Sequence, residues 1–156
     1  MAKDIATYLP LINETIEQHG FNAKGSKLGI VLHRVYVDGA GNTSDYEPTE
    51  ANDVFFEITN VTADKLSGLR YSSLFPEAKE VKFDWISVIG QAGTSYARIK
   101  FYCFSEALGK WFSFLAFSPE KGYSILVVKD ITDFKKEEIK RMVAVQMHSP
   151  LAHDNE

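Results

Sequence analysis

The chain has 156 residues, and 17 Lys and Arg against 21 Asp and Glu give it a formal net charge of −4. This length predicts one domain, and the acidic balance argues against a nucleic-acid partner, because phosphate binding needs a cationic face. The single cysteine, Cys103, excludes an internal disulfide and any site built from several thiolates. No run approaches the ~18 apolar residues of a membrane span, and the first residues lack the apolar core of a signal peptide, so we expect a cytoplasmic protein without a membrane span.

An amphipathic helix is predicted for residues 5–19. Four apolar residues recur there at helical spacing and share one face: Ile5, Leu9, Ile12 and Ile16. Gly20 is expected to end this helix. One apolar stripe on an otherwise polar helix predicts docking, either onto the body of this domain or onto a second subunit.

The next segment predicts two strands followed by several short helices. Residues 28–37 are rich in apolar and β-branched side chains and run into a glycine-rich turn, so they are expected to form a strand. A short extended piece that ends at Pro48 is expected to pair back on this strand. Asn52 and Thr62 are expected to cap short helices, and residues 78–89 predict a longer helix.

The C-terminal half predicts three strands and a closing helix: residues 95–104, 110–118 and 122–129, and then 131–147. These strands are rich in aromatic residues and are apolar on both faces. A sheet exposed on one side alternates polar and apolar side chains, so we expect a second element or a partner to cover the outer face. Because strands and helices come in separate blocks, the pattern indicates an α+β fold with an antiparallel sheet.

Two segments resemble the PAS sensory domain. One is NDVFFEITNVTADKLSGLRYSSLFP (residues 52–76), and the other is GKWFSFLAFSPEKGYSILVVKDITDFKKEE (residues 109–138), which contains the Asp-Ile-Thr ending of that family. The resemblance spans roughly residues 28–136. The family has Gly after the Thr of the first segment, whereas this chain has Asn60, the non-glycine residue type that best tolerates left-handed backbone.

The resemblance implies a PAS-like five-stranded antiparallel sheet with short helices on one face, plus N-terminal and C-terminal flanking helices. Three regions follow: an N-terminal helix and linker (1–27), a sensor domain (28–132), and a signalling helix with its tail (133–156). The implied function is a non-catalytic sensory or signal-relay module that binds a small molecule or mediates dimerisation. The implied partner is a kinase, a cyclase or another regulator, which lies in a separate protein or in a longer one from which this chain is excised.

Two interpretations remain open for the aromatic residues. Four of them are candidates for lining a cavity for a planar or hydrophobic ligand: Phe55, Trp85, Phe101 and Phe112. The same large rings also fill cores, which is the interpretation we favour. Sequence does not decide which strand face points inward, because a slip of one residue exchanges the two faces.

The histidines show no metal-ligand spacing, so no metal is predicted. The resemblance to the PAS family implies neither haem nor flavin, and an unidentified small ligand stays open. No histidine occurs in residues 78–90, where a haem-binding relative would carry one, and Cys103 lies in a strand rather than in the helical motif of light-sensing relatives. Acidic residues are scattered, so paired catalytic carboxylates are not predicted and we expect no enzyme. The alternative, a small α+β enzyme with an apolar cavity, requires titratable groups inside that cavity.

Asp130 and Thr132 are predicted to couple the sensor to its output helix. The resemblance places this Asp-Ile-Thr motif where the last strand leaves the sheet, and Thr132 is suited to capping the helix that follows. We also expect a homodimer formed through residues 5–19 and the outer sheet face. A dimerisation module without a ligand is the alternative among binding proteins.

Overall fold

A computed structural model describes residues 3–21, 27–75, 85–86, 88–89 and 98–148. The elements are α1 (Ile5–Gln18), β1 (Leu28–Val37), β2 (Thr43–Ala51), α2 (Asp53–Thr59), a 3₁₀ turn η1 (Ala63–Lys65), α3 (Tyr71–Leu74), β3 (Ile99–Ser105), β4 (Lys110–Phe117), β5 (Tyr123–Asp130) and α5 (Thr132–His148). Most of the helix predicted for residues 78–89, and the start of the strand predicted from residue 95, lie outside the described residues.

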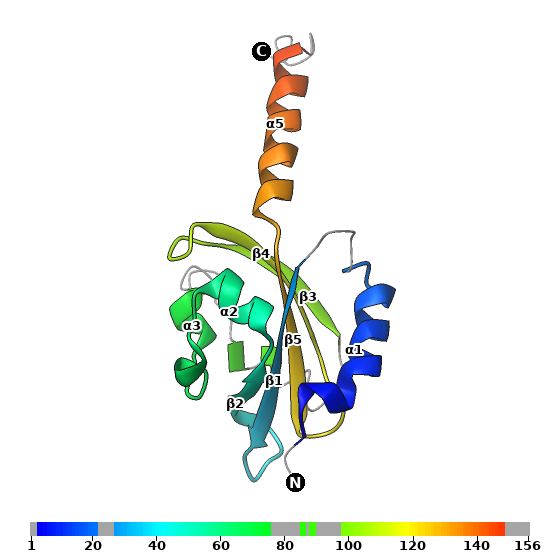
Figure 1. The fold of residues 1–156 in the computed structure, drawn as a ribbon, viewed down its shortest axis with the longest axis vertical. Helices are drawn as coiled ribbons and strands as arrows, with labels where there is room; N and C mark the ends of the chain where they lie inside the picture. The colour runs from blue at the N-terminus through cyan, green and yellow to red at the C-terminus, as the bar shows by residue number, and fades with distance from the viewer. Residues whose placement is uncertain (1–2, 22–26, 76–84, 87, 90–97, 149–156) are drawn as a thin grey trace.

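The five strands form one antiparallel sheet in the order β2-β1-β5-β4-β3. The α+β class is therefore confirmed, and the sheet order is consistent with the expected PAS-like arrangement. Figure 1 shows α2 and α3 on one side of the sheet and α1 on the other. It also shows α5 leaving the end of β5 and extending away from the rest of the molecule.

Local signals in the sequence locate α2 correctly. The Asn52 side chain accepts a hydrogen bond from Phe55 N and so caps the helix. Asn60 ends it with a left-handed φ of 61°, so the turn that usually carries glycine survives. Thr62 differs from the prediction, because it forms no side-chain capping bond to the turn that follows.

The second strand is longer than predicted: Pro48 was expected to end it, but β2 continues to Ala51. Proline lacks the N–H that a central strand needs for its ladder. Here β2 is an edge strand, and Pro48 lies opposite His33 where the register between β1 and β2 shifts. One neighbour and a local irregularity therefore accommodate the proline within the strand.

The sheet carries a core on each face. The helix-side core combines α2 and α3 with one face of all five strands, and Val31, Phe55 and Phe114 are fully buried in it. The outer core lies between α1 and the opposite face, where Ile12, Leu32 and Ile125 are fully buried. Both faces are thus covered within one chain, which explains why the strands are apolar on both sides.

The stripe of α1 differs by one residue from the prediction. Ile5, Tyr8, Ile12 and Ile16 are buried against the sheet, whereas Leu9 is 41% exposed. Because α1 of the same chain covers the outer sheet face, the apolar patch that suggested a dimer through residues 5–19 is not open to a partner. The stripe itself therefore leaves only Leu9 exposed for a dimer contact, and the predicted dimer stays a prediction.

Candidate functional site

The four aromatic residues proposed as cavity lining do lie together in the helix-side core. Phe55, Trp85 and Phe112 are buried, and the half-buried Phe101 packs against them. Their rings contact one another and further aromatic residues: the Trp85 and Phe101 centroids are 5.5 Å apart, and those of Phe101 and Phe114 are 4.8 Å apart. This packing favours the filled-core interpretation over an open ligand cavity.

A polar cluster around His33 also lies inside this core. His33 is fully buried, with Nδ1 3.2 Å from the carbonyl oxygen of Ser124 and Nε2 2.6 Å from the hydroxyl of Tyr71. A carbonyl oxygen only accepts hydrogen bonds, so Nδ1 carries the proton and Tyr71 donates to Nε2. Burial lowers the pKa of His33 to about 4, so the ring is neutral near pH 7.

Asp130 and Thr132 meet at the junction between β5 and α5, where a second site takes shape. One carboxylate oxygen of Asp130 accepts hydrogen bonds from Thr132 N at 2.9 Å and from Thr132 Oγ1 at 2.6 Å. The Thr132 hydroxyl accepts in turn from Trp111 N of β4 at 3.0 Å, and Ile131 N donates to Trp111 O at 2.9 Å. The start of α5 is therefore bonded to both β5 and β4.

This geometry changes the role predicted for Thr132. The helix begins at Thr132 itself, and the hydroxyl oxygen accepts a bond from a neighbouring strand rather than from an amide of α5. The residue joins the helix to the sheet, whereas a capping residue satisfies only its own helix. Asp130 in turn accepts hydrogen bonds from the backbone and the hydroxyl of Thr132.

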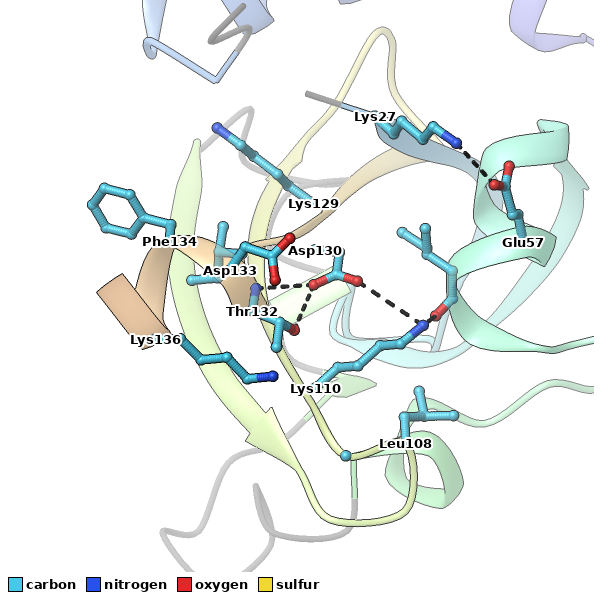
Figure 2. Close-up of a pocket in the computed structure, with 13 residues that line it drawn as sticks. Lys27, Glu57, Leu108, Lys110, Lys129, Asp130, Thr132, Asp133, Phe134 and Lys136 are labelled. Atoms are coloured by element: carbon cyan, nitrogen blue, oxygen red, sulfur yellow. Dashed lines mark hydrogen bonds and ion pairs between the residues drawn. The ribbon is translucent and has the colours of Figure 1, made fainter. Parts of the chain in front are cut away.

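Lys110 connects the same junction to the helical layer. Its ammonium group lies 3.9 Å from Asp130 Oδ2 and donates to Ile58 O, near the end of α2, at 3.3 Å. Figure 2 shows the Thr132 hydrogen bonds and the Lys110 ion pair meeting at Asp130. A continuous set of hydrogen bonds and one ion pair thus joins α2, β5, β4 and the first residue of α5.

A cleft of about 810 Å³ opens beside this network. Lys27 and Glu57 form an ion pair of 2.9 Å across its wall, and Lys136 and Asp133 of α5 also line it. Four lysines and three acidic residues belong to its described lining, so its charges largely neutralise one another. The cleft lies between α2 and the base of α5, and Lys110 contacts both Ile58 O of α2 and Asp130 of β5.

The sequence analysis identified two members of the junction and missed two others. Asp130 and Thr132 were identified by their three-residue motif. Lys110 and the main chain of Trp111 carry no signal of their own in sequence, because a lysine next to a glycine turn is usually a surface residue. Phe112 of β4 pairs with Asp130 of β5, and this register places Lys110 and Trp111 beside the Asp130–Thr132 motif.

Among the described residues, no three His, Cys, Asp or Glu side chains lie close enough together to hold a metal ion. No helix in the described part of the chain is long and apolar enough to cross a membrane. Comparison of the sequence with models of known protein families found no match, and comparison with the curated proteins found no similar sequence.

Proposed function

We propose that the protein is a PAS-type sensory or signal-relay module, without catalytic activity, whose output passes through α5. The observation that carries this proposal is the bonded network from Ile58 through Lys110 and Asp130 to Thr132. It begins in the layer that would respond to a ligand or a change in packing, and it ends at the base of the helix. The sheet order and the sequence resemblance support the same proposal.

The exposure of α5 supports an output role. Beyond its first turn the helix extends away from the sheet (Figure 1), and it carries exposed apolar side chains on one side. Ile139, Met142 and Val143 are 51%, 58% and 48% exposed and follow helical spacing. We propose that this apolar strip of α5 forms the contact of a homodimer or docks onto a downstream kinase, cyclase or regulator.

Asp130→Ala and Thr132→Ala test the coupling by hydrogen exchange. Each removes bonds that hold the first turn of α5 to the sheet, and a net loss of ~1 kcal/mol corresponds to about fivefold faster exchange. We expect this increase in residues 133–147, while β1, β4 and β5 stay protected. Asp38→Ala is the matched control, since Asp38 accepts two backbone bonds in the turn between β1 and β2.

The Lys110→Met variant tests whether the network transmits changes from α2 to α5 or only holds the start of α5 in place. In the described residues Lys110 forms no hydrogen bond or ion pair with α5, so a local joint would not respond to its loss. A relay predicts faster exchange at the base of α5 in this variant as well. If α5 and the sheet respond equally in these variants, or neither responds, the coupling role of Asp130 and Thr132 is wrong.

A further inference from the structure

A basic hollow of about 220 Å³ lies on the outer face of the sheet, between the end of α1 and the base of α5. The strand register explains its floor: Tyr102 of β3 pairs with Ser113 of β4, which pairs with Lys129 of β5. Phe21 and Phe134 stand at two of its sides. Because neighbouring strand residues point to opposite faces, Lys129 lies on the other side of the sheet from Asp130, and Figure 2 shows its ammonium group pointing away from that residue.

Three lysines line this hollow without a matching set of acids. Lys100 donates to the carbonyl oxygen of His19 at 3.1 Å, and Lys135 lies 3.7 Å from Glu138. Lys129 has no carboxylate partner among the described residues. No acidic side chain belongs to the described lining of the hollow, in contrast to the cleft beside Asp130.

The positive charges are also concentrated. The ammonium groups of Lys100 and Lys129 each lie 5.5 Å from the centroid of the Phe21 ring. Burial, and then the neighbouring charge of Lys100, lower the pKa of Lys129. An anion placed between these two lysines would relieve their mutual repulsion.

The rim of the hollow is aromatic and exposed. Tyr102 is 62% exposed and Phe134 is 60% exposed, and Lys135 lies 4.6 Å from the centre of the Tyr102 ring. Sites that enclose a small molecule usually measure about 300–1,000 Å³, whereas this hollow is smaller and lies open on the sheet. Exposed aromatic side chains such as these are enriched in protein contacts.

We propose that this hollow binds an acidic segment of a partner protein. Its carboxylates would meet Lys100 and Lys129, and its apolar carbons would contact Tyr102 and Phe134. Such a segment would contact both the sheet and the first turn of α5. The partner of the proposed relay would then be a protein that carries an acidic segment. That consequence rests on the proposed function, whereas the binding itself does not.

Fluorescence anisotropy with a short fluorescein-labelled peptide of alternating glutamate and leucine tests the binding. The Lys100→Gln/Lys129→Gln variant is expected to bind at least about tenfold more weakly than the unmodified protein. The control variant Lys65→Gln/Lys121→Gln removes the same charge at exposed sites elsewhere and is expected to stay within about twofold of the unmodified protein. Rising salt is expected to weaken binding, and a peptide with glutamine in place of glutamate is expected not to bind.

Four outcomes would overturn the proposal. The first is that the unmodified protein does not bind the peptide, and the second is that both double variants lose affinity equally, as diffuse charge attraction would produce. The third is that the glutamine peptide binds as well as the glutamate peptide. The fourth is that the unmodified protein sediments as a dimer and the Lys100→Gln/Lys129→Gln variant as a monomer, which would make this face a contact between copies. Failure of the relay appears differently, as unchanged exchange of α5 in the Asp130→Ala variant while the peptide still binds.

Discussion

His33 is a titratable base held in the interior with both ring nitrogens bonded, to Ser124 O and to the Tyr71 hydroxyl. Tyr71 belongs to α3, and its own backbone N donates to the Tyr46 hydroxyl of β2 at 3.1 Å. The two tyrosine rings stack with centroids 5.7 Å apart. At the scale of single residues, this cluster bonds the helical layer to β1 and β2 within an otherwise apolar core.

Acid is expected to destabilise the protein through His33. Its pKa falls from 6.5 to about 4 on folding because burial disfavours the charged ring, so between these values the unfolded state binds the extra proton. Stability contributed by the neutral ring is complete above pH 6.5 and decreases as the pH falls, by ~2 kcal/mol between about pH 7 and 5. Urea denaturation at several pH values measures this slope.

His33→Gln is expected to flatten that slope, whatever it does to stability at pH 7. Tyr71→Phe is the control, since it removes the donor to Nε2 and costs roughly 1–3 kcal/mol but keeps the titrating ring and therefore the slope. An equally steep slope in the glutamine variant would assign the acid sensitivity to other groups.

At the scale of elements, α2 and the first strand approach each other closely. A Cβ atom added to Gly29 of β1 would lie 2.9 Å from Phe55 Cα and 3.1 Å from Phe55 Cβ. Asn52 adds bonds across the same contact, since its side chain accepts from Ile30 N and donates to Leu28 O. Glycine is therefore required at this position by the proximity of the helix backbone.

Gly29→Ala is expected to destabilise the protein by about 1–3 kcal/mol, because a backbone contact this short forces α2 away from the sheet. Gly39→Ala is the matched control, since nothing lies within 4 Å of its added Cβ. Urea denaturation compares the two. Equal stabilities would show that α2 shifts without cost, which would contradict the tight packing inferred here.

At the scale of the whole molecule, the covered and uncovered surfaces differ. The part of the outer sheet face formed by β1, β5 and β4 is covered by α1, whereas the apolar strip of α5 and the exposed rings of Tyr102 and Phe134 face solvent. These exposed surfaces lie on or beside the helix that leaves the sheet. Contacts with other molecules are therefore expected around α5 rather than around α1.

Ile139→Glu/Met142→Glu tests the proposed dimer. Charges in the middle of the apolar strip would be buried unpaired in a helix-to-helix contact, so sedimentation is expected to show a dimer for the unmodified protein and a monomer for the variant. Lys140→Glu, on the same helix but outside the strip, is expected to remain a dimer. Identical masses for all three proteins would contradict a dimer through α5.

The sequence by itself determined the features that depend on short stretches of chain. The Asn52 cap, the left-handed Asn60 and the end of α1 just before the left-handed Gly20 follow from backbone preferences of single residues. The positions of β1, β4 and β5 follow from runs of apolar side chains, and a motif of three residues identified Asp130 and Thr132. These features can be predicted from sequence because they depend on interactions between residues that are close together in the chain.

Only the tertiary structure decided which groups meet. The register of β4 and β5 brings Lys110 to Asp130, which lies twenty positions further along the chain, and aligns Tyr102, Ser113 and Lys129 across three strands. The same holds for the burial of the α1 stripe, where Tyr8 takes the place expected for Leu9. A slip of one residue would exchange both sheet faces, so these contacts depend on packing throughout the domain rather than on any segment alone.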